Sequence, residues 1–167
     1  NAGNDAITKM TFSAWIKRCA TGAYQRIFNA TDAGDNENFI FRDTDVLQFY
    51  SGDASADVKT NRTFEDTSKF YHIVLRVDTT QSTASDRVRI YVDGEEITSL
   101  ATATYPSQDA DTAFNGNVAH DIGRSNSSNQ YFDGYMAEVN FADGQSYGPD
   151  TFGLTDTSTG RWIPKSL

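Results

Sequence analysis

Short segments with apolar residues at every second position recur along this chain. In segment 7–18, the alternate positions that would form one face of an extended strand are Met10, Phe12, Ala14 and Ile16. Trp15 falls on the opposite face, which indicates that this face is partly covered as well. Segments 71–78 and 87–92 repeat the pattern, and a spacing of two predicts β-strands because successive strand side chains point to opposite faces.

Residues that favour tight turns separate these segments. Asp93-Gly94 lies between two strand-like arms and predicts a hairpin, because both central positions of such a turn need a positive φ. Segment 132–144 predicts a late strand that presents one face made of Tyr135, Ala137, Val139 and Phe141. We expect about ten short strands, a helical turn after Gly148-Pro149, and no amphipathic helix of three turns or more. This pattern predicts an all-β, two-sheet antiparallel sandwich or a barrel.

Composition agrees with this fold class and limits the function. The 167 residues include 11 Phe and 8 Tyr, which favour strands. The single cysteine, Cys19, allows no internal disulfide, and we expect its thiol to be partly buried. The formal net charge of −9 argues against nucleic acid as a partner, because a phosphate backbone requires a cationic surface. No stretch of the sequence is apolar for long enough to predict a membrane span.

We expect residues 1–167 to form one domain. No linker divides the sequence, and no repeat of 20–50 residues occurs in it. The sequence does not begin with Met, enters a predicted strand almost at once, and stops soon after the segment 162–165. We therefore expect this domain to be part of a longer polypeptide.

Five motifs occur in an order that matches a known family. They are TFSAWIKR (11–18), FYHIVLRVD (70–78), RIYVDGEEI (89–97), HDIGR (120–124) and FDGYMAEVNFADG (132–144). In order and spacing they resemble the laminin-G-like domain, a concanavalin A-like jelly roll. The resemblance covers nearly the whole chain and implies a two-sheet antiparallel jelly-roll sandwich. It also implies a structural role for His72, which matches a strand histidine of that family.

The C-terminal half resembles a narrower group. Segments 103–115, 120–124, 130–153 and 159–165 are similar to a variant of this domain that occurs in marine bacteriophage structural proteins. This likeness implies a fibre or decoration domain of a virion, located at the virion surface or extracellularly. It also implies other virion proteins, or further copies of this chain, as partners.

A polysaccharide hydrolase or lyase is the less favoured interpretation. Sandwich glucanases carry strand-spaced carboxylates as E-x-D-x-E, and this pattern does not occur in the sequence. The acidic pairs Glu65-Asp66 and Glu95-Glu96 are adjacent in sequence, so on a strand their members point to opposite faces. A lyase would need Tyr, His and Arg on one face, and the chain has only two histidines. We therefore predict a non-catalytic module.

An oxygen-rich loop is the candidate metal site. The ligands that it would offer to Ca²⁺ are Asp32, Asp35 and Asn36. Laminin-G domains often bind Ca²⁺ at one rim, so the resemblance implies such a site, although the strict twelve-residue Ca²⁺ loop is absent. The alternative is an ordinary turn in which Asp caps its own backbone. We expect no other cofactor.

Aromatic and polar loop residues are candidates for a ligand surface, because aromatic faces stack on sugar rings while Asn and Arg bond to hydroxyl groups. The candidates are Tyr24, Tyr105, Arg124, Asn126, Asn129 and Tyr131. Alternatively, the tyrosines pack half-buried at the edges of the sandwich, and Arg124 braces a neighbouring loop. With the resemblance, these residues predict a module that recognises surface glycans. A purely architectural virion domain without a ligand is the alternative.

Overall fold

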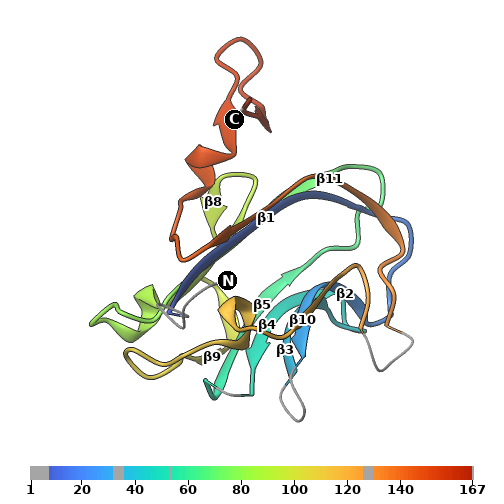
Figure 1. Ribbon diagram of the computed structural model, residues 1–167. Coiled ribbons are helices and arrows are strands. Elements are labelled where there is room, and N and C mark those ends of the chain that lie inside the picture. Colours follow the sequence, from blue (N-terminus) through green and yellow to red (C-terminus); the bar gives the residue numbers. More distant parts are fainter. Residues whose placement is uncertain (1–7, 32–35, 53, 126–129, 167) are drawn as a thin grey trace.

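The computed structural model describes residues 8–31, 36–52, 54–125 and 130–166, and within these ranges the chain is an all-β sandwich. Two large antiparallel sheets lie face to face, and a short arm of C-terminal residues lies beyond one of them (Figure 1). The helical elements in these ranges are three 3-10 turns, at Ala84–Asp86 (η1), Ala113–Asn115 (η2) and Pro149–Thr151 (η3). The third is the turn that the sequence predicted. The described residues contain no helix with the length and apolarity of a membrane span.

The first sheet has five strands in the order β11-β1-β6-β7-β8, and each neighbouring pair is antiparallel. Their bounds are Gly134–Asp143 (β11), Lys9–Arg18 (β1), Tyr71–Asp78 (β6), Val88–Val92 (β7) and Glu95–Glu96 (β8). The predicted hairpin joins β7 to β8, and its Asp93 and Gly94 have φ values of 53° and 86°. Positive values at both positions match the right-handed twist of the two strands.

The second sheet has six strands in the order β10-β2-β3-β4-β5-β9. Their bounds are Ala119–Ile122 (β10), Gln25–Thr31 (β2), Asn36–Phe41 (β3), Val46–Ser51 (β4), Ala56–Thr63 (β5) and Leu100–Thr104 (β9). Strands β2 to β5 are consecutive in the chain and pair as a meander, while β9 and β10 add the two edges. The four consecutive strands therefore present one continuous outer face.

The hydrophobic core lies between the two sheets and contains the residues that the alternation predicted. On β1 the fully buried members are Met10, Phe12, Ala14 and Ile16. On β3 and β4 the facing members are Phe39, Phe41, Leu47 and Phe49. The ring of Phe12 stacks on that of Phe28 with 5.0 Å between centroids. Burying a side chain of this size contributes about 1.5–3 kcal/mol, so this interface is the main source of stability.

A charged side chain, Arg18, is buried at the end of β1. Its guanidinium donates to Oδ1 of Asp45 at 2.8 Å, to the carbonyl oxygen of Phe64 at 2.7 Å and to Oε1 of Gln25 at 3.2 Å. It also lies 4.5 Å from the ring centroid of Phe41. A buried cation is tolerated when it is paired and hydrogen-bonded. These contacts therefore tie β2 and the β3–β4 turn to β1.

Two local expectations from the sequence are wrong. Alternation places Tyr135 and Phe141 on one face of β11, but Glu138 has a φ of 48° and the pairing with β1 shifts register there. This β-bulge reverses the direction of the side chains beyond it. Met136 therefore packs against the core on one side of the bulge, and Phe141 contacts the buried ring of Phe28 on the other side. Tyr135 is exposed. Cys19, expected to be partly buried, is exposed.

The C-terminal arm is attached to the outer face of the five-stranded sheet. It contains the two-stranded pair Gly153–Thr155 (β12) and Trp162–Pro164 (β13). Nε1 of Trp162 donates to Nδ1 of His72 at 2.9 Å, and the ring of Trp15 stacks on His72 with 4.9 Å between centroids. The arm residue Phe152 packs into a second buried apolar cluster on β6 and β7. The second face of β1 is thus covered, as Trp15 indicated, and His72 has a structural role in attaching the arm to the sheet.

Candidate functional site

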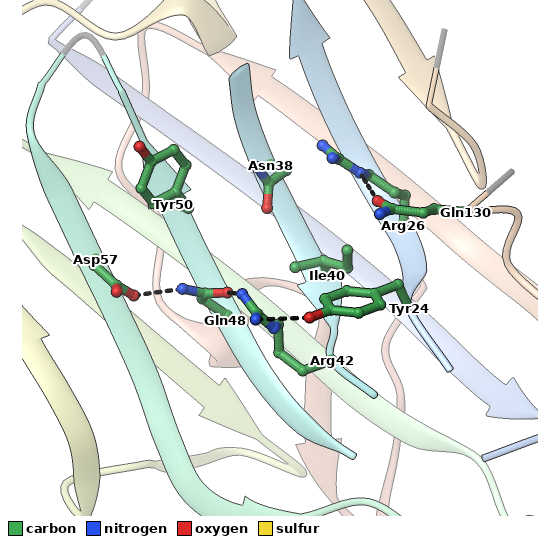
Figure 2. Close-up of a pocket in the computed structure, with 9 residues that line it drawn as sticks. All are labelled: Tyr24, Arg26, Asn38, Ile40, Arg42, Gln48, Tyr50, Asp57 and Gln130. Atoms are coloured by element: carbon green, nitrogen blue, oxygen red, sulfur yellow. Dashed lines mark hydrogen bonds between the residues drawn. The ribbon is translucent and has the colours of Figure 1, made fainter. Parts of the chain in front are cut away.

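The outer face of the six-stranded sheet carries polar side chains where its inner face is apolar. Between the core residues of β3 and β4, the outward-facing side chains are Asn38, Ile40, Gln48 and Tyr50 (Figure 2). Arg26 of β2 and Asp57 of β5 extend this face to either side. Because alternate residues of neighbouring strands share a face, these side chains form one surface although four strands supply them.

A hollow of about 440 Å³ lies on this surface. Its lining residues are Tyr24, Arg26, Asn38, Ile40, Arg42, Gln48, Tyr50, Asp57 and Gln130. Tyr24 precedes β2, Arg42 follows β3 and Gln130 precedes β11, so three loops close the sides of the hollow (Figure 2). The volume falls in the range of about 300–1,000 Å³ that is typical of small-ligand sites.

Hydrogen bonds hold part of this lining in a row. Nε2 of Gln48 donates to Oδ1 of Asp57 at 2.6 Å, and Oε1 of Gln48 accepts from Nη1 of Arg42 at 2.8 Å. Nη2 of Arg42 donates to the Tyr24 hydroxyl at 2.9 Å, and the guanidinium lies 4.7 Å from the Tyr24 ring centroid. Gln48 and Arg42 are each held by two partners, so the row is ordered before a ligand arrives, which lowers the entropic cost of binding.

Arg26 occupies the side of the hollow opposite Asp57 (Figure 2). Its Nε donates to Oε1 of Gln130 at 2.8 Å, and its Nη1 donates to Oδ1 of Asn29 at 2.5 Å. The backbone N–H of Arg26 also donates to the carbonyl oxygen of Gln130 at 3.2 Å. Burial lowers the pKa of Arg26 from its usual value, because a desolvated surrounding disfavours the charged form.

These groups suit a ligand rich in hydroxyl groups. The guanidinium and amide N–H groups donate hydrogen bonds, while amide and carboxylate oxygens accept them. The ring of Tyr50 is 40% exposed at the edge of the hollow and offers an apolar face. Polar groups beside an aromatic face match the alternating polar edges and apolar faces of a sugar ring.

The structure brings part of the predicted ligand surface to this hollow. Tyr24 lines it directly. Tyr131 is 60% exposed and follows the lining residue Gln130 in the chain. Asn126 and Asn129 lie outside the described residues. The loop before β11 therefore contributes to the site through Gln130, one residue away from the tyrosine that the sequence singled out.

The other two predicted residues lie elsewhere. Tyr105 lines a separate hollow of about 230 Å³ next to β7 and β9. Burial raises the pKa of its hydroxyl. Arg124 is exposed, and its Nε lies 2.7 Å from Oδ1 of Asp121, which is consistent with a bracing role. The structure therefore does not bring these two residues together with Tyr24.

Several lining residues were missed by sequence reasoning. They are Arg26, Asn38, Ile40, Arg42, Gln48, Tyr50, Asp57 and Gln130. The available signal was the alternation in segments 38–41 and 47–50, where polar or mixed residues separate core residues. This pattern identifies an outer face, but it does not say which residues on different strands become neighbours.

The proposed Ca²⁺ ligands are largely outside the described part of the chain. Asp32 and Asp35 are not described, and of Asn36 only the backbone is described, at the start of β3. Across the described ranges, no group of three or more His, Cys, Asp or Glu side chains is arranged to hold a metal ion. Ca²⁺ binding by this loop stays a prediction.

Sequence comparison identifies the family of this fold. A laminin-G-type family model, described as the concanavalin A-like lectin/glucanases superfamily, matches residues 1–145. The chain belongs to this superfamily. The match confirms the resemblance drawn from the five motifs, while the narrower bacteriophage variant stays a prediction. A comparison with curated protein sequences finds no match.

Solved structures share the fold at low sequence identity. A candidate carbohydrate-binding protein from Bacteroides ovatus matches 96% of this chain at TM-score 0.62 and 19% identity. The CBM40 of the Ruminococcus gnavus IT-sialidase, bound to α2,3-sialyllactose, matches 87% at 0.58 and 11% and is itself 81% covered. A heptameric SAP-like pentraxin from Limulus polyphemus matches 80% at 0.53 and 11%. The chain spans 52% of the Bacteroides protein and 63% of the pentraxin.

Proposed function

We propose that this chain is a non-catalytic carbohydrate-binding module whose ligand occupies the hollow on the six-stranded sheet. The observation that carries the proposal is the preformed row from Tyr24 through Arg42 and Gln48 to Asp57, beside the exposed ring of Tyr50. This row combines donors, acceptors and aromatic surface in one hollow, which is the combination that sugar rings require.

The compared structures support a binding role. One is named as a candidate carbohydrate-binding protein, and another is a sialidase-associated CBM40 bound to a sialylated sugar. Their identities of 19% and 11% establish a common fold and no common ligand. The ligand of this chain therefore depends on its own side chains.

The lining of the hollow also supports binding over hydrolysis. Most glycoside hydrolases use two carboxyl groups about 5–10 Å apart, one on each side of the scissile bond. Asp57 supplies the one carboxylate among the described lining residues, and Gln48 donates a hydrogen bond to it at 2.6 Å. A single, engaged carboxylate suits the recognition of a hydroxyl group.

A glycan array with two matched tyrosine variants tests the proposal. Tyr50→Ala removes an exposed ring of the hollow, and Tyr131→Ala removes an exposed ring from the neighbouring loop. Since both side chains are exposed, neither change should unfold the protein. We expect Tyr50→Ala to weaken glycan binding about tenfold, or about 1.4 kcal/mol, and Tyr131→Ala to weaken it less.

If Tyr131→Ala weakens glycan binding more than Tyr50→Ala does, the ligand binds at the loop before β11 and not in the hollow. If no glycan on the array binds the wild-type protein, the architectural alternative replaces the carbohydrate-binding module. Release of reducing ends or unsaturated uronates from algal or bacterial polysaccharides would show catalysis and overturn the non-catalytic assignment.

We further propose a virion setting for the module, as a fibre or decoration domain at the virion surface or in the extracellular space. The support is the resemblance of segments 103–115, 120–124, 130–153 and 159–165 to bacteriophage structural proteins. Other virion proteins and further copies of this chain are the proposed protein partners. Antibodies against the purified domain should label intact phage particles in electron micrographs, and light scattering should report an oligomer. Unlabelled particles that contain the protein internally would contradict the surface location.

A further inference from the structure

The two arginines of the hollow are held by neutral oxygen atoms. Arg26 donates to the side-chain amide oxygens of Gln130 and Asn29. Arg42 donates to the amide oxygen of Gln48 and to the hydroxyl of Tyr24. Among the described residues, no carboxylate oxygen lies within 4.0 Å of either guanidinium.

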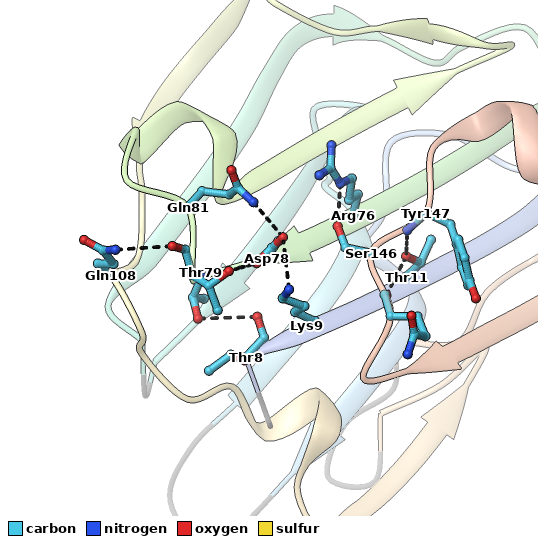
Figure 3. A network of polar contacts seen from close by, with 12 residues as sticks. Thr8, Lys9, Thr11, Arg76, Asp78, Thr79, Gln81, Gln108, Ser146 and Tyr147 are labelled. Carbon is cyan, nitrogen blue, oxygen red and sulfur yellow. Dashed lines mark hydrogen bonds and ion pairs between the residues drawn. The ribbon is translucent and has the colours of Figure 1, made fainter. Parts of the chain in front are cut away.

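Arginines elsewhere in this chain are held in both ways. Arg76 donates to the hydroxyl of Ser146 (Figure 3) and Arg87 donates to backbone carbonyl oxygens, whereas three others are paired with carboxylates. Arg18 is paired with Asp45, Arg89 with Asp86 and Glu96, and Arg124 with Asp121. The chain has 23 acidic residues against 14 basic ones, so carboxylates are abundant. The lining of the hollow contains two guanidiniums and one carboxylate, that of Asp57, so it carries a net positive charge although neither guanidinium is bonded to that carboxylate.

Neutral partners position a guanidinium without satisfying it. Each arginine has five N–H donors, and the hydrogen bonds described above use two on each side chain. Burial acts against the charge of Arg26, as the lowered pKa of its guanidinium indicates. An anion in the hollow would offset this desolvation and bond to the remaining donors, because charge-assisted hydrogen bonds are the stronger ones.

We infer that the carbohydrate bound in this hollow is anionic, and that Arg26 and Arg42 bind its carboxylate or sulfate groups. This inference rests on the proposed function and narrows it to one class of ligand. The shared chemistry is an acidic sugar, whether its charge comes from a uronic or sialic acid or from a sulfate ester. Both anions accept two parallel hydrogen bonds from a guanidinium.

The strand register sets how far apart the two arginine-binding positions lie across the sheet. Arg26 pairs with Ile40, and Ile40 pairs with Gln48, to which Arg42 is bonded. Arg26 and Gln48 are thus two strand spacings apart, about 10 Å. Ile40 lies between them with only 3% exposure and forms an apolar floor, over which charge interactions are strengthened.

The carboxylate of the hollow lies away from Arg26. Asp57 belongs to β5, three strands from β2, and is engaged by Gln48 (Figure 2). An anionic group at Arg26 is therefore about 14 Å of sheet width away from Asp57. Asp57 and Asn38 remain available to sugar hydroxyl groups, so the acidic part of the ligand should lie toward β2 and its neutral part toward β5.

An array of neutral, carboxylated and sulfated glycans tests this inference, with lactose, 3′-sialyllactose and 3′-sulfated lactose as a matched set. Calorimetry then compares wild-type protein with Arg26→Gln, Arg42→Gln and, as a charge-matched control, Arg161→Gln. Arg161 is exposed on the C-terminal arm and does not line the hollow. We expect binding to acidic glycans alone, with a loss of about 10- to 100-fold in each hollow variant and no loss in the control.

Lysine variants separate geometry from charge. Arg26→Lys and Arg42→Lys keep the charge but lose the planar pair of donors, so we expect partial recovery of binding relative to the Gln variants. Circular dichroism and thermal melting check that each variant is folded. The carboxylated and sulfated arms of the array decide which anion is the natural ligand.

The outcomes separate this inference from the proposed function. Equal binding of neutral and acidic glycans, or acidic binding that survives in folded Arg26→Gln or Arg42→Gln protein, overturns the anionic ligand and leaves the carbohydrate-binding module standing. Loss in Arg161→Gln to the same extent also overturns it, because net charge would then explain the effect. Absence of binding to every glycan overturns both.

Discussion

Lowering the pH should destabilise this protein through one buried histidine. His72 is fully buried, and its Nδ1 accepts a hydrogen bond from Nε1 of Trp162 at 2.9 Å. Because an indole N–H can only donate, Nδ1 carries no proton. The proton of the neutral ring is therefore on Nε2, which lies 2.9 Å from Oγ of Ser13. Protonation of Nδ1 would break the bond to Trp162 and place a charge in a buried aromatic stack.

The size of the effect follows from the pKa of His72. Burial lowers this pKa from 6.5 to about 4. The folded protein thus binds the proton less readily than the unfolded chain, so the stabilisation is complete above pH 6.5 and is lost as the pH falls toward 4. The full loss is about 3 kcal/mol, and about 2 kcal/mol is lost at pH 5. This loss is a large part of the free energy of unfolding of a typical domain, which is about 5–15 kcal/mol.

Urea unfolding at pH 7, 6 and 5, followed by tryptophan fluorescence, measures this loss. The variant His72→Gln cannot be protonated, so we expect its free energy of unfolding to fall by about 2 kcal/mol less than that of the wild type between pH 7 and 5. Titration of the carboxylates is common to both proteins and cancels in the difference.

An identical pH dependence in wild type and His72→Gln would refute the reasoning. A second measurement does not depend on the variant being folded. In the NMR spectrum of the wild type, the ring resonances of His72 should stay unchanged between pH 8 and 6. A shift with a midpoint above pH 6 would mean that burial does not hold this ring neutral.

Three further predictions concern the buried ion pair, the arm and the metal loop. Asp45→Asn leaves the guanidinium of Arg18 buried without its counter-charge, so the free energy of urea unfolding at pH 7 should fall by about 3–5 kcal/mol, and an unchanged midpoint would contradict this. Trp162→Ala removes the donor to His72; we expect a loss of about 2 kcal/mol and faster proteolysis of residues 149–166, and wild-type cleavage rates would count against it. If Asp32, Asp35 and Asn36 bind Ca²⁺, excess Ca²⁺ should raise the melting temperature above that measured with a chelator. Equal melting temperatures would contradict Ca²⁺ binding.

Burial along single strands could be predicted from the sequence. The alternation of Met10, Phe12 and Ile16 reports which face of β1 meets the core, and all three are fully buried. The Asp93-Gly94 turn could also be predicted, because a tight hairpin restricts its two central residues to a few types. Both features are local, since period and turn chemistry are written into neighbouring residues.

Features that depend on distant residues could not be predicted. Trp162 bonds to His72, which lies 90 positions earlier in the chain, and no local pattern connects the two. The bulge at Glu138 inserts one residue into an otherwise regular alternation, so the period alone gives the wrong face for part of β11. The row of Tyr24, Arg42 and Gln48 likewise requires the β3–β4 pairing and the loop before β2 to be known together.

The two sheets differ in the chemistry of their outer faces, and this difference agrees with the proposed position of the ligand on the six-stranded sheet. The outer face of the five-stranded sheet carries the apolar side chains of Trp15, Val74 and Tyr91. Leaving them in contact with water would be costly, and the C-terminal arm covers them. The outer face of the six-stranded sheet carries polar groups such as Arg26 and Gln48, which are positioned by hydrogen bonds to neighbouring side chains and are compatible with water. The sheet that needs no cover is the one free to bind a ligand. The outward positions of each strand therefore carry functional information that the core-facing positions do not.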